Sequence, residues 1–167
     1  MTANYNRARY ANYLAPCFAG QSIVEGCTLT SNGVPFQSLD GKPTSNAPKW
    51  TGNLAVNYET GLGGGLATAI GFNARYSSAY LASPFNNTLA RQGSYVSLDA
   101  SFRIKTADDR YELALIGRNL TNRFIINGTL DIVGTGSGTG TNNAVRADQA
   151  GLVGSPRTVQ VQATFRF

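Results

Sequence analysis

The sequence predicts an all-β protein, an antiparallel up-and-down meander of strands of the transmembrane β-barrel class. Residues 158–167 alternate strictly between apolar and polar side chains, and the chain stops on Phe167. Successive side chains of a strand point to opposite faces, so one face of such a strand suits lipid and the other suits a barrel lumen. Long and short connections also alternate along the chain, as they do in bacterial outer-membrane barrels.

Composition agrees with a strand-rich membrane protein. Only 14% of the 167 residues are charged, against about 25% in a typical soluble domain. The 19 glycines supply many turns, and no apolar run reaches the roughly 18 residues that a transmembrane helix needs. The net charge of +5 comes from scattered basic residues. Because a nucleic-acid site requires a basic patch or stripe, we expect no nucleic-acid partner.

About six strands are predicted in order. Two short turns, at residues 61–65 and 106–110, each join a pair of strands into a hairpin. The first predicted strand alternates poorly, whereas the later ones alternate well. The expected strands are residues 4–14, 50–60, 66–76, 94–105, 111–122 and 158–167.

The cost of placing a charge in lipid orients these strands. A basic side chain that faces lipid near the membrane midplane costs about 2–4 kcal/mol. Asp99 and Arg103 must therefore face the lumen, whereas Leu98 and Phe102 face lipid. Ile116 interrupts the polar face of its strand. The same alternation predicts a lumen-facing wall made of Asn53, Asn57, Asn73, Arg75, Asp99, Arg103, Glu112, Arg118, Gln160 and Gln162.

The three long loops, residues 15–47, 77–93 and 123–154, carry the remaining candidate features. Cys17 and Cys27 lie in the first loop, where a disulfide would contribute on the order of 2–3 kcal/mol and would imply an oxidising compartment. Two unrelated thiols are the alternative. Residues 134–141 of the third loop alternate Gly with Ser or Thr and predict a flexible segment. They do not form a phosphate-binding loop, because no Lys-Ser or Lys-Thr follows the glycines.

Catalysis is not expected. The sequence contains no histidine, so neither a Ser-His nor a Cys-His arrangement is available. No two carboxylates are spaced as an obvious acid and base, and we expect neither a cofactor nor a metal. A soluble β-sandwich is the remaining alternative for the fold, but the terminal Phe165 and Phe167 suit lipid better than a soluble core.

Four segments resemble TonB-dependent outer-membrane receptors, in the order in which that family carries them. Residues 47–58, which begin APKWT, resemble one barrel strand of the family. YVSLDA at 95–100 and GRNLTN at 117–122 resemble two later segments. QATFRF at 162–167 is similar to the C-terminal strand, so Phe165 and Phe167 are expected to act as the signal that the barrel-assembly machinery reads.

The resemblance also implies what surrounds this chain. Such receptors have a barrel of 22 strands, an N-terminal plug and a TonB box, and the six predicted strands match the last six of the barrel. Six strands are also fewer than the eight of the smallest barrels, and the first residues, MTANYNRARY, contain no apolar signal segment. We therefore expect residues 1–167 to be a C-terminal barrel segment without the plug, either a natural fragment or the result of a truncated gene model.

The function implied by the resemblance is uptake of a scarce nutrient across the outer membrane of a Gram-negative bacterium. Siderophores, vitamins and oligosaccharides are the substrate classes of the family, and the sequence does not choose among them. The expected partners are outer-membrane lipid, the remaining barrel and plug, and TonB through the intact receptor. A small autonomous barrel with a structural or adhesive role is the alternative.

Loop aromatic residues are the candidate contacts for a ligand. In TonB-dependent receptors the extracellular loops take part in binding, so aromatic side chains in the three long loops are the ones to consider. The alternative, which we favour, is that they anchor the loops or lie at the membrane interface. The candidates are Phe18, Phe36, Tyr80, Phe85 and Phe124.

Overall fold

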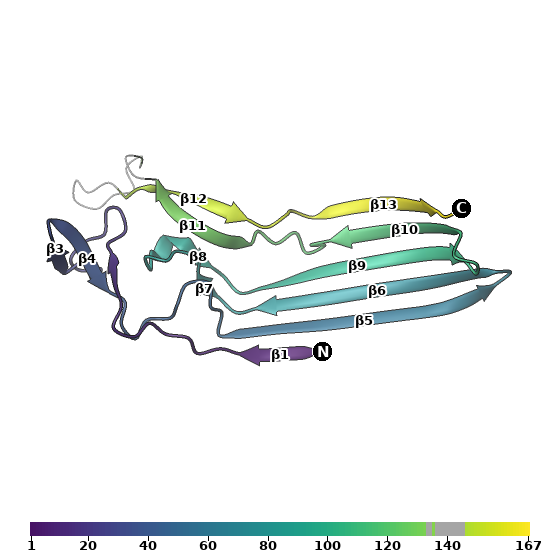
Figure 1. The fold of residues 1–167 in the computed structure, drawn as a ribbon, viewed down its shortest axis with the longest axis horizontal. Helices are drawn as coiled ribbons and strands as arrows, with labels where there is room; N and C mark the ends of the chain where they lie inside the picture. The colour runs from purple at the N-terminus through teal and green to yellow at the C-terminus, as the bar shows by residue number, and fades with distance from the viewer. Residues whose placement is uncertain (133–134, 136–145) are drawn as a thin grey trace.

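A six-stranded antiparallel sheet is the main element of the structure, a computed structural model that describes residues 1–132, 135 and 146–167. Its long strands lie side by side in the order β1-β5-β6-β9-β10-β13 (Figure 1). The all-β class and the six-stranded meander are confirmed, and among the described residues the sheet does not close on itself. The strands are β1 (Thr2–Tyr5), β5 (Trp50–Gly63), β6 (Leu66–Ser77), β9 (Tyr95–Thr106), β10 (Tyr111–Arg118) and β13 (Thr158–Phe165).

One face of this sheet is apolar and uncovered. Strand alternation and the pairing register place large apolar side chains of neighbouring strands next to each other, as with Val56 opposite Phe72 and Leu115 opposite Phe102. These side chains remain exposed across β5, β6, β9, β10 and β13. A soluble monomer seldom exposes so large an apolar surface, whereas a strand in a bilayer turns it toward lipid. Among the described residues there is no helix long and apolar enough to cross a membrane.

The predicted strand 4–14 is wrong in its boundaries. The structure has β1 at Thr2–Tyr5 and a separate β2 at Leu14–Pro16, with a single bridge between Arg9 and Pro43 in the intervening segment. Asn12 adopts a positive φ of 51°, a left-handed conformation that a strand cannot contain. Poor alternation in this stretch therefore marked a broken strand.

Two other strands end earlier than expected. β10 stops at Arg118 rather than at residue 122, because Asn119 has a positive φ of 47°. β13 ends at Phe165, two residues before the end of the chain. β5, by contrast, extends beyond the expected residue 60 and ends at Gly63. Gly63, Gly64 and Gly65 form the turn that follows, and all three have positive φ.

The long loops contain short sheets that sequence analysis did not predict. β2 pairs with β4 (Val34–Ser38), which also pairs with β3 (Leu29–Ser31). The second loop holds β7 (Tyr80–Leu81), the 3-10 helix η1 (Thr88–Ala90) and β8 (Arg91–Gln92), and the third holds β11 (Ile126–Ile132) and β12 (Asp148–Val153). All of these elements lie at one end of the long strands (Figure 1). The segment 134–141, predicted to be flexible, lies outside the described residues apart from Thr135.

A short segment after β10, residues 119–122, completes the sheet where that strand stops. The backbone N–H of Leu120 donates to the carbonyl of Leu98 at 2.7 Å, and the Thr121 hydroxyl donates to the carbonyl of Val96 at 2.9 Å. Leu120 also lies across Gly117, where an added Cβ would come within 2.6 Å of a Leu120 methyl carbon. This segment therefore hydrogen-bonds to the part of β9 that β10 does not reach.

Asn119 holds this arrangement together from a buried position. Its backbone N–H donates to the Asp99 carboxylate at 2.8 Å. Its side-chain amide donates to the carbonyls of Arg123 and Ser155, at 2.9 and 3.0 Å, and accepts from the Arg123 N–H at 2.9 Å. One side chain therefore connects the end of β10 with the segment that leads into β13.

We predict that Asn119→Gly destabilises the folded barrel. Glycine keeps the left-handed backbone conformation, but the carbonyls of Arg123 and Ser155 lose their donor and the Arg123 N–H loses its acceptor. Each such hydrogen bond contributes about 0.5–1.5 kcal/mol. Urea unfolding of the natural full-length protein in detergent, followed by heat-modifiable mobility on gels, measures the change. Thr121→Val is the comparison variant: it removes the exposed hydrogen bond to the Val96 carbonyl and a longer contact of 3.4 Å with the Asn119 side-chain oxygen, and it should have a smaller effect. Equal unfolding midpoints for the wild type and Asn119→Gly would contradict the role of this side chain.

Candidate functional site

The ten side chains predicted to face the lumen share one face of the sheet. Register places Asn53 opposite Arg75 and Asn73 opposite Asp99. The same face continues across the sheet, where Ile116 lies opposite Gln160. We call this face, opposite the apolar one, the polar wall; it consists of Asn53, Asn57, Asn73, Arg75, Asp99, Arg103, Glu112, Arg118, Gln160 and Gln162.

Part of the polar wall surrounds a shallow hollow of about 320 Å³. Gly71 forms its floor, since a Cβ there would lie 2.7 Å from the Ser101 hydroxyl oxygen. Ile116, the apolar residue on this face, also lines it. Five wall residues come together here: Asn57, Asn73, Asp99, Arg103 and Arg118.

Ion pairs on this wall lie mostly near its short-turn end. The Lys105 ammonium is 2.8 Å from the Glu59 carboxylate and 3.2 Å from that of Asp109, and Arg103 approaches Glu112 at 4.0 Å. Exposed pairs of this kind contribute about 0–1 kcal/mol each. They orient side chains along the wall more than they stabilise the fold.

The short sheets of the three long loops pack into one unit, which we call the loop cluster, residues 14–39, 80–92, 126–132 and 146–153. Asp131 of β11 connects all three loops. Its carboxylate accepts the backbone N–H of Ala19 at 3.0 Å, the Asn87 amide at 3.3 Å and the Gln149 amide. Hydrogen bonds to a charged group are stronger than neutral ones. Sequence reasoning missed Asp131, because nothing in its local pattern reveals partners in other loops.

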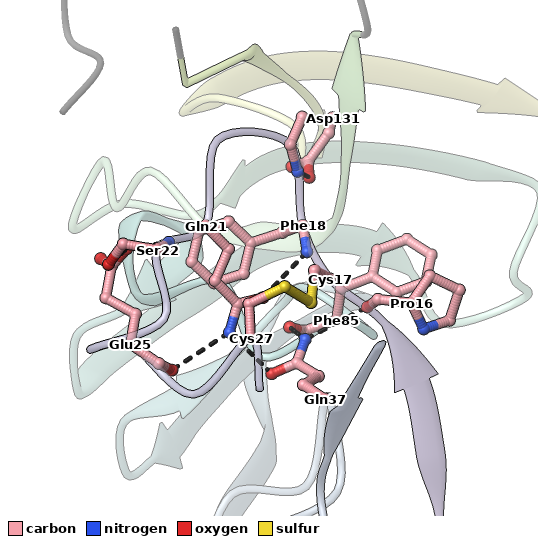
Figure 2. Close-up of a disulfide and its surroundings, with 11 residues drawn as sticks. Pro16, Cys17, Phe18, Gln21, Ser22, Glu25, Cys27, Gln37, Phe85 and Asp131 are labelled. Carbon is pink, nitrogen blue, oxygen red and sulfur yellow. Dashed lines mark hydrogen bonds between the residues drawn. A yellow bond between two sulfur atoms is a disulfide. The ribbon is translucent and has the colours of Figure 1, made fainter. Parts of the chain in front are cut away.

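Gln37 of β4 makes a second connection, between the first loop and the second (Figure 2). Its side chain is completely buried. The amide group donates to the carbonyls of Pro16 at 3.2 Å and Phe85 at 2.8 Å, and its oxygen accepts from the Gln21 amide at 3.0 Å. A buried amide with all these partners is favourable, whereas removing one partner leaves a costly unsatisfied group.

A disulfide joins Cys17 and Cys27 in the first loop (Figure 2). Within the loop that it closes, the Glu25 carboxylate accepts the N–H and the hydroxyl of Ser22, both at 2.9 Å. Glu25 also forms an ion pair with Arg146 of the third loop. The Arg146 guanidinium lies 5.6 Å from the ring centroid of Phe18, so the disulfide-bonded loop is held against the third loop by charge and by a cation–π contact.

The five candidate aromatic residues differ in accessibility. Phe18 is only 5% exposed, whereas Phe124 is 68% exposed, and Phe36, Tyr80 and Phe85 are partly buried. The Tyr80 hydroxyl donates to the carbonyl of Ile126 at 2.8 Å. Burial, and then the neighbouring Tyr95, raise the pKa of Tyr80 to about 12. These contacts favour an anchoring role for Phe18 and Tyr80 and leave Phe124 as the accessible ring.

A mostly apolar cavity of about 410 Å³ opens within the loops. Each of the three loops contributes to its lining, with Asn46 from the first, Pro84 from the second and Leu152 from the third. Thr129 also lines it; this residue is 8% exposed, and its hydroxyl has no hydrogen-bond partner among the described residues. The volume and the mixture of apolar walls with a few polar groups are those of small-molecule sites. No sequence pattern marks this cavity.

Comparison with known families identifies the chain. The family model described as TonB dependent receptor-like, beta-barrel matches residues 2–120, well over half of the sequence. The chain belongs to this family. TonB-dependent receptors are receptors and transporters of the outer membrane, and membership of the family implies plug and TonB interactions in the parent protein. Searches of curated proteins and of solved structures found no match.

We predict that Asp131→Ala loosens the loop cluster of this receptor. The substitution leaves N–H groups of two other loops without their acceptor, at a cost of about 1.5–3 kcal/mol for bonds to a charged group. Cleavage of a transiently opened segment follows the population of the open form, so loop proteolysis should become about tenfold faster. Limited trypsin digestion of intact outer membranes measures it. Asp148→Ala, which changes an exposed carboxylate at the start of β12, should digest like the wild type; an equal acceleration in both variants would contradict the prediction.

Proposed function

We propose that this receptor takes up a scarce nutrient, a siderophore, a vitamin or an oligosaccharide, and that the loop cluster contributes to the ligand site. The observation that supports this is the convergence of all three long loops on one cavity of about 410 Å³. Asp131 and Gln37 fix the loops relative to one another, which gives the cavity a preformed shape. The unpartnered Thr129 hydroxyl is the polar group that the cavity offers to a ligand. Phe124, the exposed ring among the candidate aromatic residues, lies outside the cavity lining.

The orientation of the chain follows from its family membership. In outer-membrane barrels the short turns are periplasmic and the long loops extracellular. We infer that the loop cluster lies outside the cell of a Gram-negative bacterium, with Phe167 at the periplasmic end and the polar wall toward the lumen. The 167 residues then supply the last strands of a larger barrel, and the remaining strands and the plug come from the rest of the receptor.

An open sheet favours this larger barrel over a small autonomous one. The smallest known barrels contain eight strands, whereas the principal sheet has six among the described residues. The short loop strands pair among themselves instead of extending that sheet. With edges at β1 and β13, the sheet has backbone groups that lipid cannot hydrogen-bond.

Uptake assays in cells that carry the natural full-length gene test the proposed function. Cells are given labelled ferric siderophores, cobalamin and maltooligosaccharides in turn, and uptake is compared between the wild type, a strain without this gene and a strain without TonB. We expect uptake of one class to be lost in both deletion strains. Unchanged uptake of every class, together with loss of surface adhesion in the gene deletion, would favour the structural alternative instead.

A substitution in the cavity lining tests whether the transported ligand binds there. Leu152→Trp places a larger side chain at the edge of the cavity and should raise the half-saturating ligand concentration about tenfold, equivalent to 1.4 kcal/mol. Leu62→Trp makes the same change at an exposed leucine near the end of β5, at the short-turn end of the sheet, and should leave uptake unchanged. Equal uptake constants in the two variants would place the ligand elsewhere.

We further predict that deleting Phe167 impairs assembly of the full-length receptor. Phe165 and Phe167 are proposed as the signal that the barrel-assembly machinery reads, and both rings are exposed. The amount of heat-modifiable barrel in outer membranes should fall severalfold, while Phe165→Tyr, which keeps an aromatic ring, should assemble. Normal amounts of folded barrel without Phe167 would show that the terminal ring is not part of the signal.

A further inference from the structure

A basic pocket of about 340 Å³ lies where β1 leaves the sheet and enters the first loop. Its lining includes the side chains of Arg7, Arg9 and Lys49, and no acidic residue. None of these three cations belongs to an ion pair among the described residues. Arg9 is fixed in place because its guanidinium donates to the carbonyl of Gly41, and a guanidinium has five donors, so others remain available.

Asp40, in the turn beside Gly41, does not line this pocket and forms no ion pair with its cations among the described residues. Its carboxylate accepts the backbone N–H of Asn12 at 3.0 Å. Three unpaired cations close together repel one another, and an anion of matching geometry relieves that repulsion. Arginine forks match the oxygens of a phosphate or a carboxylate group in two parallel hydrogen bonds, so an oxyanion suits this pocket.

The pocket is continuous with the apolar face of the sheet. Tyr5, which lines it, is paired with Trp50 in the register of β1 and β5, and the two rings lie 4.7 Å apart. The Lys49 ammonium lies 5.7 Å from the centroid of the Tyr5 ring. Leu54 and Val56 follow Trp50 on the same face, deeper along β5. Apolar side chains, then an aromatic pair, then cations therefore follow one another toward the loop end.

This order is that of a membrane interface, where Tyr and Trp mark the boundary between acyl chains and headgroups. We propose that the pocket binds the phosphate-bearing headgroup of a lipid in the outer leaflet, with its acyl chains along the apolar face of β1 and β5. Basic pockets at this depth attract anionic headgroups. A soluble anion would use the cations equally well but would gain nothing from the adjacent lipid-facing aromatic pair. The site is separate from the loop cavity and does not depend on the transported ligand.

Native mass spectrometry of the full-length receptor in detergent tests this site. The probes are bis-phosphorylated lipid A, the same lipid without its phosphates, and inorganic pyrophosphate. We expect adducts of the phosphorylated lipid on the wild type and roughly thirtyfold weaker binding in the double variant Arg7→Gln/Lys49→Gln, from the loss of two basic residues near the headgroup. The dephosphorylated lipid should bind all forms weakly.

Two further variants separate specific binding from general effects. Arg91→Gln/Arg157→Gln removes two exposed arginines of the same end of the molecule and should bind lipid A like the wild type. Arg7→Lys/Lys49→Arg keeps both charges and should also retain binding, which distinguishes a charge effect from misfolding. The proposal is overturned if the control loses as much affinity as the Gln variant, if the dephosphorylated lipid binds equally, or if pyrophosphate displaces lipid A at equal concentration.

Discussion

The need to hydrogen-bond every backbone group without help from water is the constraint on which this structure depends. Lipid offers neither donors nor acceptors, so a strand in the membrane must be paired on both sides. The ladders that join β5, β6, β9, β10 and β13 meet this need between neighbouring strands. Among the described residues, the outer edge of β13 and most of the outer edge of β5 have no partner strand. Where β10 ends early, Leu120 and Thr121 supply donors to β9 in its place. The GRNLTN segment is therefore part of the sheet in its hydrogen bonding, although its backbone is not extended.

A single sheet between lipid and lumen does not bury its large apolar side chains within the protein. Buried large apolar side chains therefore lie in the loops. Phe18, Leu39 and Ala82 are buried there, whereas the large apolar residues of the long strands remain exposed. Small loop strands cannot be stabilised by apolar burial alone, and buried polar groups complete their packing. Asp131 and Gln37 each collect donors or acceptors from separate loops. The disulfide closes residues 17–27, the segment between β2 and β3, which contains no strand.

Period-two alternation explains why the sequence predicts the sheet well and the loops poorly. Strands of eight or more residues show the period clearly, and the cost of a charge in lipid decides which face is polar, as Asp99 and Arg103 illustrate. Strands of two to seven residues, such as β7 and β11, are too short for the pattern to be distinguished from chance. The partners of Asp131 are far away in the chain, with Ala19 separated by 112 residues. Only the folded arrangement brings such residues together.

The loop cavity and the basic pocket illustrate different ways of building a site on this scaffold. The basic pocket lies at the end of two neighbouring strands: its aromatic pair belongs to the ladder between β1 and β5, and its cations lie just beyond that ladder. The cavity takes its walls from three loops, so its shape depends on the hydrogen bonds that connect them. A substitution at Asp131, which does not line the cavity, would then alter ligand affinity by displacing the walls relative to one another. Under the proposed function, ligand affinity is sensitive to residues that never touch the ligand, whereas the proposed lipid site depends on residues that contact the lipid, the pocket cations and the apolar face of β1 and β5 beside them.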